Sequence, residues 1–247
     1  MTQSNRILVT GATSGIGFAV ASALLAEGRS VVAVGRHFEK VHELSARYPG
    51  RVEMLHAALE DSGDARFVVQ RALKTGPLHG FVSAAGFAHH ELMGAISERS
   101  FREQFEVNTF APMRIGEELV AKLEVGSAMV FLTSTLAHRP VPTSYVYSAT
   151  KAALLSAVKS LALAGAPRMV RVNAVSPGVV DTPMARAPRP GESGEEVIAA
   201  RMTALGKLHA LGRVGAATEV ADAVLYLLSA PWTTGSELVV DGGLLLA

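Results

Sequence analysis

The chain has 247 residues, of which 49% are hydrophobic and 18% are charged, so it can form a sizeable core and is not expected to be disordered or fibrous. The 23 lysines and arginines are matched by 22 acidic residues, and a formal charge of +1 predicts no nucleic acid or anionic membrane as partner. The absence of cysteine excludes disulfides and cysteine-based metal sites and is compatible with a reducing compartment.

The first segment, Met1–Thr10, is too short to contain the apolar region of a signal peptide. Charges interrupt the most apolar later windows, such as Phe18–Ala26 and Leu154–Leu163, before they reach the roughly 20 residues that span a bilayer. We therefore expect a soluble protein of the cytoplasm that has no membrane partner.

Short β-branched runs alternate with longer segments of helical periodicity along the whole chain, which predicts a parallel sheet. Most of the runs are apolar throughout, as in strands whose two faces are both buried. Since parallel connections need right-handed crossovers, helices are expected on both faces. The expected strands are Ile7–Thr10, Ser30–Val34, Val52–His56, Gly80–Ala84, Ala128–Thr133, Val170–Val175 and Glu237–Asp241. The expected helices are Ile16–Glu27, Phe38–Tyr48, Ala65–Lys74, Ser97–Leu123, Thr143–Leu163 and Ala217–Ser229.

No internal repeat, low-complexity tract or linker interrupts this alternation. Residues 1–247 are therefore predicted to form a single α/β domain, a doubly wound parallel sheet of the Rossmann type with about seven strands. One segment departs from the pattern, because Thr182–Gly194 contains three of the 11 prolines and a helix-like patch, Glu195–Leu205, follows it. We interpret residues 182–210 as a substrate loop over a binding site, with an inert surface insertion as the alternative.

A glycine-rich turn follows the first expected strand directly and leads into a helix. Gly11, Gly15 and Gly17 allow a tight turn and let a pyrophosphate approach the amides at the helix N-terminus, whose partial positive charge favours an anion. Glycine clusters also occur in ordinary turns, but the order of strand, turn and helix favours dinucleotide binding.

Gly35 directly follows the second expected strand, at the place where an acidic residue would bind the ribose 2′-hydroxyl of NAD(H). Arg36 follows, and its guanidinium can pair with a 2′-phosphate. We therefore predict NADP(H) as the cofactor, with Arg36 and His37 as the residues that read it. In the alternative interpretation Arg36 stacks on the adenine of either cofactor, which leaves NAD(H) open.

Tyr147 and Lys151 are four residues apart, so in a helix they project from the same face. An ammonium about 5 Å from a phenolate lowers the pKa of the phenol from about 10 towards neutral. Such a tyrosine can exchange a proton with an alcohol or a carbonyl while hydride passes to or from a nicotinamide. Taken alone, the pair is a weak pattern that favours an ordinary surface helix.

Further motifs follow in a fixed order. Ser134 comes directly after the expected strand Ala128–Thr133, Asn108 lies in the segment Phe105–Thr109, and a Pro-Gly motif occupies the segment Arg171–Met184. The segments Gly212–Gly215 and Val240–Gly243 continue this series of motifs. With the spacing Gly-x-x-x-Gly-x-Gly and the Tyr-x-x-x-Lys pair, essentially the whole chain resembles the short-chain dehydrogenase/reductase family.

The resemblance implies a role for each of these residues. Tyr147 would be the general acid/base, Lys151 would lower its pKa and hold the nicotinamide ribose, and Ser134 would bind the reacting oxygen. Asn108 would position a water in a proton relay. Tyr145 has no lysine four residues later and is expected to line the pocket. The implied cofactor-binding residues are Gly11, Thr13, Ser14, Gly15, Ile16, Gly17, Arg36, Leu59, Ala85, Gly86, Tyr147, Lys151, Pro177, Gly178, Val180 and Thr182.

Two positions depart from the family's pattern. The family has Asn-Asn-Ala-Gly after the fourth strand, whereas this chain has Ser83-Ala84-Ala85-Gly86. Ala58 stands where the family often has an aspartate near the adenine amine. Two polar contacts on the adenosine side are therefore missing, and we expect Leu59 and backbone groups to shape the adenine slot and the cofactor to bind more weakly.

Ligands in this topology bind beyond the carboxyl ends of the strands, so the loops that contain His89, His90, His138 and Arg139 are expected to wall the pocket. His138 or Arg139 would bind an acidic or polar substituent, or remain solvated loop residues. No metal is expected at the adjacent histidines, because no carboxylates accompany them.

These observations predict an NADP(H)-dependent oxidoreductase that acts on a small-molecule secondary alcohol or ketone. The alternatives are an NAD-dependent dehydrogenase of the same family and a cofactor-binding sensor or scaffold without catalysis. The substrate stays open among 3-oxoacyl thioesters, sugars or polyols, cyclic ketones or hydroxysteroids, and dihydrodiols. The family resemblance implies a homotetramer, and the apolar surface of the long expected helices Ser97–Leu123 and Thr143–Leu163 favours burial against another subunit.

Overall fold

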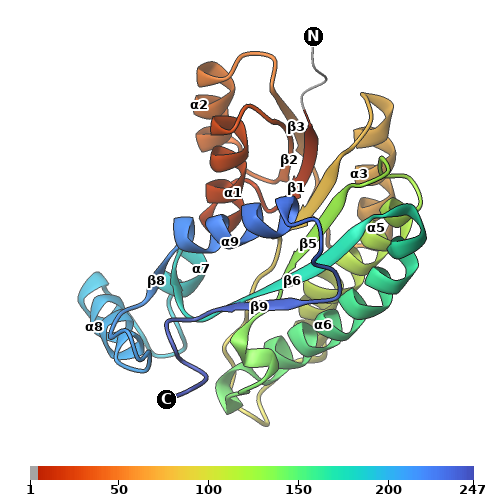
Figure 1. The fold of residues 1–247 in the computed structure, drawn as a ribbon. Helices are drawn as coiled ribbons and strands as arrows, with labels where there is room; N and C mark the ends of the chain where they lie inside the picture. The colour runs from red at the N-terminus through yellow and green to blue at the C-terminus, as the bar shows by residue number, and fades with distance from the viewer. Residues whose placement is uncertain (1–4) are drawn as a thin grey trace.

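A seven-stranded parallel sheet forms the centre of the molecule (Figure 1). The computed structural model describes residues 5–247, and the strand order is β3-β2-β1-β4-β5-β6-β9. The strands are β1 (Arg6–Thr10), β2 (Ser30–Gly35), β3 (Val52–His56), β4 (Gly80–Ser83), β5 (Ala128–Leu132), β6 (Arg171–Pro177) and β9 (Glu237–Val240). All of their pairings are parallel, and the order reverses between β1 and β4, which confirms the predicted doubly wound Rossmann-type fold.

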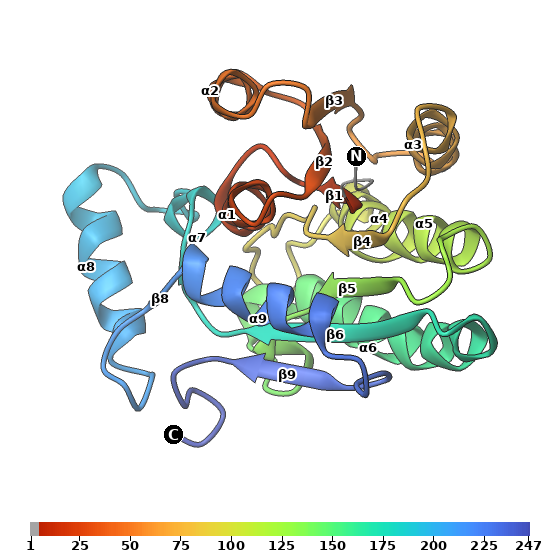
Figure 2. The ribbon, with the colours of Figure 1, turned by 45° about the horizontal axis from the view of Figure 1, so that its top comes forward.

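Helices cover both faces of the sheet (Figure 2). One face carries α1 (Gly15–Ala26), α2 (Glu39–Arg47) and α9 (Ala217–Ser229), and the other carries α3 (Ser62–Lys74), α4 (Glu98–Phe105), α5 (Ala111–Val120) and α6 (Tyr145–Gly165). No helix in the described part of the chain is long and apolar enough to cross a membrane.

The core on each face is built by alternate residues of the buried strands. In β5 all five residues are buried, with Met129 and Phe131 in the cluster under α5 and α6, and Val130 in the cluster under α1 and α9. This is why an apolar run without alternation predicts a strand here. Phe131 meets Phe81 of β4 edge to face, with 5.5 Å between the ring centroids.

The predicted strands and helices agree with the observed ones to within one to three residues, apart from one long helix. The expected helix Ser97–Leu123 is wrong as a continuous element, because a π-helical turn over Glu106–Phe110 separates α4 from α5 and α5 ends at Val120. Pro112 supplies no backbone N–H, so the regular bond from residue 112 to residue 108 cannot form, and the ladder shifts at this point.

The segment after β6 projects beyond the carboxyl ends of the strands (Figure 2). It contains α7 (Pro183–Arg186) and α8 (Glu195–Gly206), and the helix-like patch Glu195–Leu205 is thereby confirmed as a helix. The two-residue strands β7 (Val180–Asp181) and β8 (Gly215–Ala216) were not predicted; they pair in parallel and close this segment at its base.

Replacing Phe131 by alanine is expected to lower the free energy of unfolding by about 3–5 kcal/mol, because the ring is fully buried and its loss leaves a cavity. Urea denaturation followed by circular dichroism measures the effect. Phe67→Ala is the matched control, since Phe67 of α3 is 48% exposed and its loss should cost less than about 1 kcal/mol. Equal losses in the two variants would contradict the assignment of Phe131 to the core.

Candidate active site

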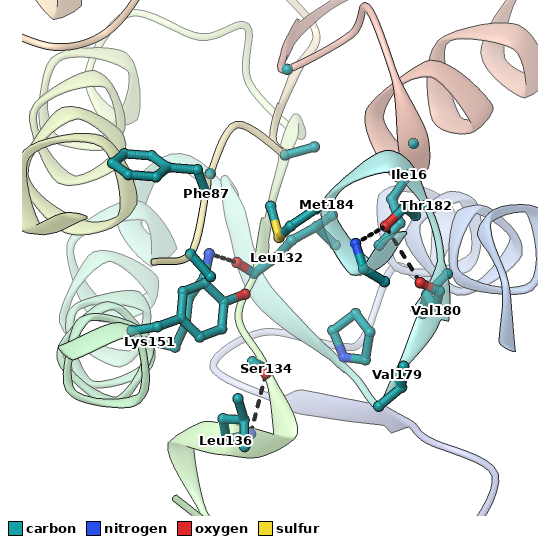
Figure 3. A pocket seen from close by; sticks show the side chains of 18 of the residues that line it. Ile16, Phe87, Leu132, Ser134, Leu136, Lys151, Val179, Val180, Thr182 and Met184 are labelled. Atoms are coloured by element: carbon teal, nitrogen blue, oxygen red, sulfur yellow. Dashed lines mark hydrogen bonds between the residues drawn. The ribbon is translucent and has the colours of Figure 1, made fainter. Parts of the chain in front are cut away.

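A cavity of about 760 Å³ opens at the carboxyl ends of the strands, beside the point where the strand order reverses (Figure 3). Its lining joins segments that lie far apart in the sequence. Of the residues predicted for the site, those that line this cavity are Gly11, Thr13, Ser14, Gly15, Ile16, Gly17, Arg36, Leu59, Ala85, Gly86, Ser134, Tyr147, Lys151, Pro177, Gly178, Val180 and Thr182. Asn108, predicted as a catalytic residue, does not line the cavity, and neither does His37, which was predicted to read the cofactor together with Arg36.

The glycine turn has the geometry of a phosphate cradle. Gly11 has a φ of +68° and Gly15 a φ of +52°, a region that residues with a side chain rarely adopt. A Cβ at Gly17 would lie 2.2 Å from the Gly11 carbonyl oxygen. The side chain of Ser14 does not cap α1, so it leaves the first amides of the helix without a side-chain partner at its N-terminus. The residues present therefore fit the diphosphate of a dinucleotide.

At the end of the cavity formed by Gly35 and Arg36, the structure contains an ion pair that the sequence did not predict. A Cβ at Gly35 would lie 2.4 Å from the Thr13 methyl carbon, so this position has no room for an acidic side chain. Arg36 lies at the rim, where its guanidinium is 3.1 Å from the carboxylate of Glu60 and both side chains are more than half exposed. Leu59 is buried with a φ of +62° and lines this end of the cavity.

Tyr147 lies near the start of α6 and is partly exposed towards the cavity. Ser134 follows β5, lies close enough to the phenol to act on its pKa, and accepts a hydrogen bond from the Leu136 amide at 3.2 Å. Desolvation by the surrounding protein raises the pKa of Tyr147 to about 12, and the interaction with Ser134 only partly opposes this.

Lys151 lies one helical turn after Tyr147 and is buried. Its ammonium donates to the Leu132 carbonyl at 2.9 Å and lies 5.6 Å from the centre of the Tyr147 ring (Figure 3). Burial lowers the pKa of Lys151 to about 8. The predicted fall of the Tyr147 pKa towards neutral is therefore wrong for this arrangement, because the ammonium faces the ring and a carbonyl while desolvation of the phenol dominates.

Asn108 is fully buried in the π-helical turn. Its amide nitrogen donates to the Phe87 carbonyl at 2.8 Å and to the Thr150 hydroxyl at 3.3 Å, and its oxygen accepts from the Phe87 amide at 3.0 Å. The side chain thus ties the loop after β4 to α6. It orients the cavity wall beside Lys151 and does not itself face the cavity.

Comparison with known proteins identifies the family that has this arrangement. The family described as enoyl-(acyl carrier protein) reductase matches residues 11–245. An L-xylulose reductase of Caenorhabditis elegans is 33% identical over 245 residues, which cover 96% of this chain and 94% of the relative. The chain belongs to the short-chain dehydrogenase/reductase family.

Solved structures agree with this assignment. The ligand-free aldohexose dehydrogenase of Thermoplasma acidophilum has a TM-score of 0.88 and 27% identity, over 99% of this chain and 95% of the other. A blue fluorescent protein from a metagenomic library, solved in complex with NADPH, has a TM-score of 0.86 and 26% identity over 97% of each chain. This short-chain dehydrogenase/reductase is therefore an oxidoreductase of a family that binds a nicotinamide cofactor.

Three side chains that the sequence suggested for the pocket are engaged elsewhere in this family member. The His138 imidazole lies 2.6 Å from the Glu237 carboxylate and does not line the cavity. Arg139 lines the cavity, but its guanidinium donates to backbone oxygens of the C-terminal segment, at Leu244 and Ala247. Tyr145 packs edge to face against Phe101 and does not line the cavity.

Other site residues escaped the sequence analysis. The sequence analysis did not single out Ser144 or Arg189, and both line the cavity together with His90, whose loop was expected to wall the pocket. His209 is buried, accepts from the Val179 amide at 3.2 Å and contacts the Leu205 carbonyl at 2.9 Å through its other ring nitrogen, so it ties the end of α8 to the strand β7. A single histidine or arginine in a loop has no spacing pattern, so the sequence offered no signal for these contacts.

The lowered pKa of Lys151 predicts a pH dependence of stability. Because the folded chain releases this proton at about pH 8 and the unfolded chain only near 10.5, the unfolded state binds more protons between these values. The free energy of unfolding of the wild type should therefore rise, relative to Lys151→Met, as the pH is raised from about 8 to about 10. Urea titrations across this interval test the sign, and a constant difference would contradict the burial of a charged lysine.

Proposed function

We propose that the protein is an NADP(H)-dependent oxidoreductase that transfers a hydride between the nicotinamide and a secondary alcohol or ketone, with Tyr147 as the general acid/base. The observation that carries the proposal is the convergence of Tyr147, Ser134 and Lys151 on the cavity that begins at the glycine turn. In this proposal residues 1–247 form one cofactor-binding domain and residues 182–210 its substrate loop.

The bound nicotinamide supplies or accepts the hydride. The first amides of α1 and the glycine turn would hold its diphosphate, Lys151 the nicotinamide ribose, and the Val180 backbone with Thr182 the carboxamide. Thr182 is well placed for this, since its methyl carbon would be 3.3 Å from a Cβ at Gly15 and its hydroxyl caps α7 by accepting from the Ala185 amide. The relative solved with NADPH supports the choice of cofactor.

In this proposal Tyr147 acts as the proton donor in the reducing direction. Near neutral pH the phenol is protonated, so it could donate a proton to the carbonyl oxygen of a substrate, and Ser134 could donate a second hydrogen bond to the same oxygen. The Lys151 ammonium beside the ring would then stabilise the phenolate. Asn108 would support the proton relay by fixing Phe87 and Thr150.

Arg36 would bind the 2′-phosphate of NADP(H). Its present partner, Glu60, is the specific observation that favours the alternative, NAD(H), because a carboxylate at this rim can accept from a ribose hydroxyl and repels a phosphate. A sensor or scaffold without catalysis receives no support, since the relatives are named as reductases and dehydrogenases.

We also propose that the protein works in the cytoplasm as a homotetramer. Support comes from apolar side chains that α5, α6 and the turn before them leave in solvent, with Phe110 43%, Met113 37% and Leu163 79% exposed.

Tyr147→Phe should lower kcat by about 10²–10⁴-fold, because the proton donor is lost, while NADPH still binds. Initial rates at the reduced-nicotinamide absorbance band with a panel of ketones, together with NADPH fluorescence titrations, measure both quantities. Tyr145→Phe is the matched control on the same helix and should retain the wild-type rate, since its ring lies against Phe101. A Tyr147→Phe enzyme with a normal rate would exclude the proposed acid.

Arg36→Gln should weaken NADPH binding by about tenfold and change NADH binding little, because one exposed charge-assisted contact with the 2′-phosphate is removed. Glu60→Gln should have the opposite effect on NADPH, since it frees Arg36 and removes a repelling carboxylate. Dissociation constants of NADPH and NADH, measured for the wild type and for both variants, test these expectations. Equal or tighter binding of NADH by the wild type would favour the NAD-dependent alternative.

A further inference from the structure

The charged residues that line the cavity are almost all basic. Among the described lining residues, the only acidic side chain is Glu60, which lies at the adenosine end and pairs with Arg36. The remaining charged side chains of the lining are Arg139, Lys151, Arg189 and Lys207. The part of the cavity that is left for a substrate therefore carries an excess of positive charge.

Arg189 differs from Lys151 and Arg139, two other cations that line this cavity. Lys151 is bonded to the Leu132 carbonyl, and Arg139 to the backbone oxygens of Leu244 and Ala247. The Nε of Arg189 is buried without any hydrogen-bond partner among the described residues, and no described carboxylate lies within ion-pair distance of its guanidinium. An unpartnered buried donor of this kind is costly unless a ligand satisfies it.

The acidic residue closest to Arg189 along the chain is already engaged. Glu192 lies 2.8 Å from the Arg201 guanidinium, an ion pair that is mostly buried, and it accepts from the Arg189 backbone amide at 3.0 Å. Arg201 is further fixed by the carbonyls of Ala185 and Ala187. Arg189 and Arg201 thus have one carboxylate between them, that of Glu192. Because Glu192 forms its ion pair with Arg201, the charge of Arg189 has no ion-pair partner among the described residues.

The neighbours of Arg189 place this charge on the side of the reacting tyrosine. His90 is close enough for the charges of Arg189 and Arg201 to act on it, and together with burial they lower its pKa to about 4, so it is neutral near pH 7. The His90 Nδ1 lies 3.0 Å from the hydroxyl of Ser144, three residues before Tyr147. None of these contacts involves the glycine turn, where the cofactor diphosphate would bind.

We propose that Arg189 binds a carboxylate of the substrate, so that the substrates are hydroxy acids or oxo acids whose carboxylate is remote from the reacting carbon. This inference rests on the proposed function, which supplies the reaction at Tyr147. The planar guanidinium can donate two parallel hydrogen bonds to a carboxylate, and the neutral His90 and the Ser144 hydroxyl beside it provide further polar contacts. Arg189 is a specificity residue here and takes no part in proton transfer.

Turnover of a matched pair of ketones tests the inference. With NADPH, 4-oxocyclohexanecarboxylate should be reduced with a higher kcat/KM than its methyl ester, and Arg189→Gln should lower the acid-to-ester ratio of kcat/KM by about 10- to 100-fold, chiefly through KM. Arg189→Lys should restore part of the ratio. Arg186→Gln is the matched control from the same loop, because Arg186 pairs with Asp181 outside the cavity, and it should leave the ratio unchanged.

A binding measurement separates this inference from the proposed function. Cyclohexanecarboxylate, which has no carbonyl to reduce, should bind the NADPH-loaded protein in calorimetry, and Arg189→Gln should lose that binding while NADPH affinity persists. If this binding is observed but no ketone is reduced, the proposed function fails and the anion site stands. If neutral ketones are reduced, with no preference for the acid and no Arg189-dependent binding, the anion site is wrong. A loss of NADPH affinity in Arg189→Gln would likewise overturn it, since Arg189 would then serve the cofactor.

Discussion

The cavity depends on a close approach of two backbone segments at the carboxyl ends of β1 and β4. A Cβ at Gly11 would come within 2.6 Å of the Ala85 amide nitrogen, and a Cβ at Gly17 within 2.2 Å of the Gly11 oxygen. Backbone atoms cannot yield as a flexible side chain can, so a methyl group at either position would push α1 away from the sheet. The helix N-terminus and the Thr182 segment that packs on Gly15 would move with it, because the turn holds both in place.

The opposite wall places two ionisable groups where burial disfavours their charged forms. Lys151 can remain protonated because the Leu132 carbonyl, the last of β5, accepts from it at 2.9 Å. Asn108 ties the chain after β4 to α6 and thereby keeps the wall beside Lys151 closed. The protonated phenol and the buried ammonium thus follow from the way β5 and α6 pack.

The sequence predicts most of this arrangement because its strongest signals are local. Apolar runs such as Ala128–Leu132 and the strand, turn and helix around Gly11 are set by neighbouring residues, and the structure contains both. The break at Pro112 was missed because one proline near the start of a turn also suits an unbroken helix. The predicted downward shift of the Tyr147 pKa was wrong, because spacing along a helix gives the distance to Lys151 but not the desolvation of the phenol. Arg189 and His209 lie in segments without periodicity, where contacts depend on how the loop folds back.

The residues proposed for proton exchange and the residue proposed for substrate selection lie on parts of the fold that are held in different ways. Ser134 and Lys151 are attached to β5 and α6, whose apolar residues form the core under the sheet. Arg189 stands between Pro188 and Pro190, which fix the backbone and cannot join a helix, in a loop held by the Glu192–Arg201 pair and by bonds of Arg201 to two carbonyls. Local opening of such a loop exposes little apolar surface, whereas displacement of Lys151 would require the core to open. If the proposed roles hold, substrates would enter and leave by movement of the segment that contains Arg189, while the groups proposed to exchange the proton would keep their geometry.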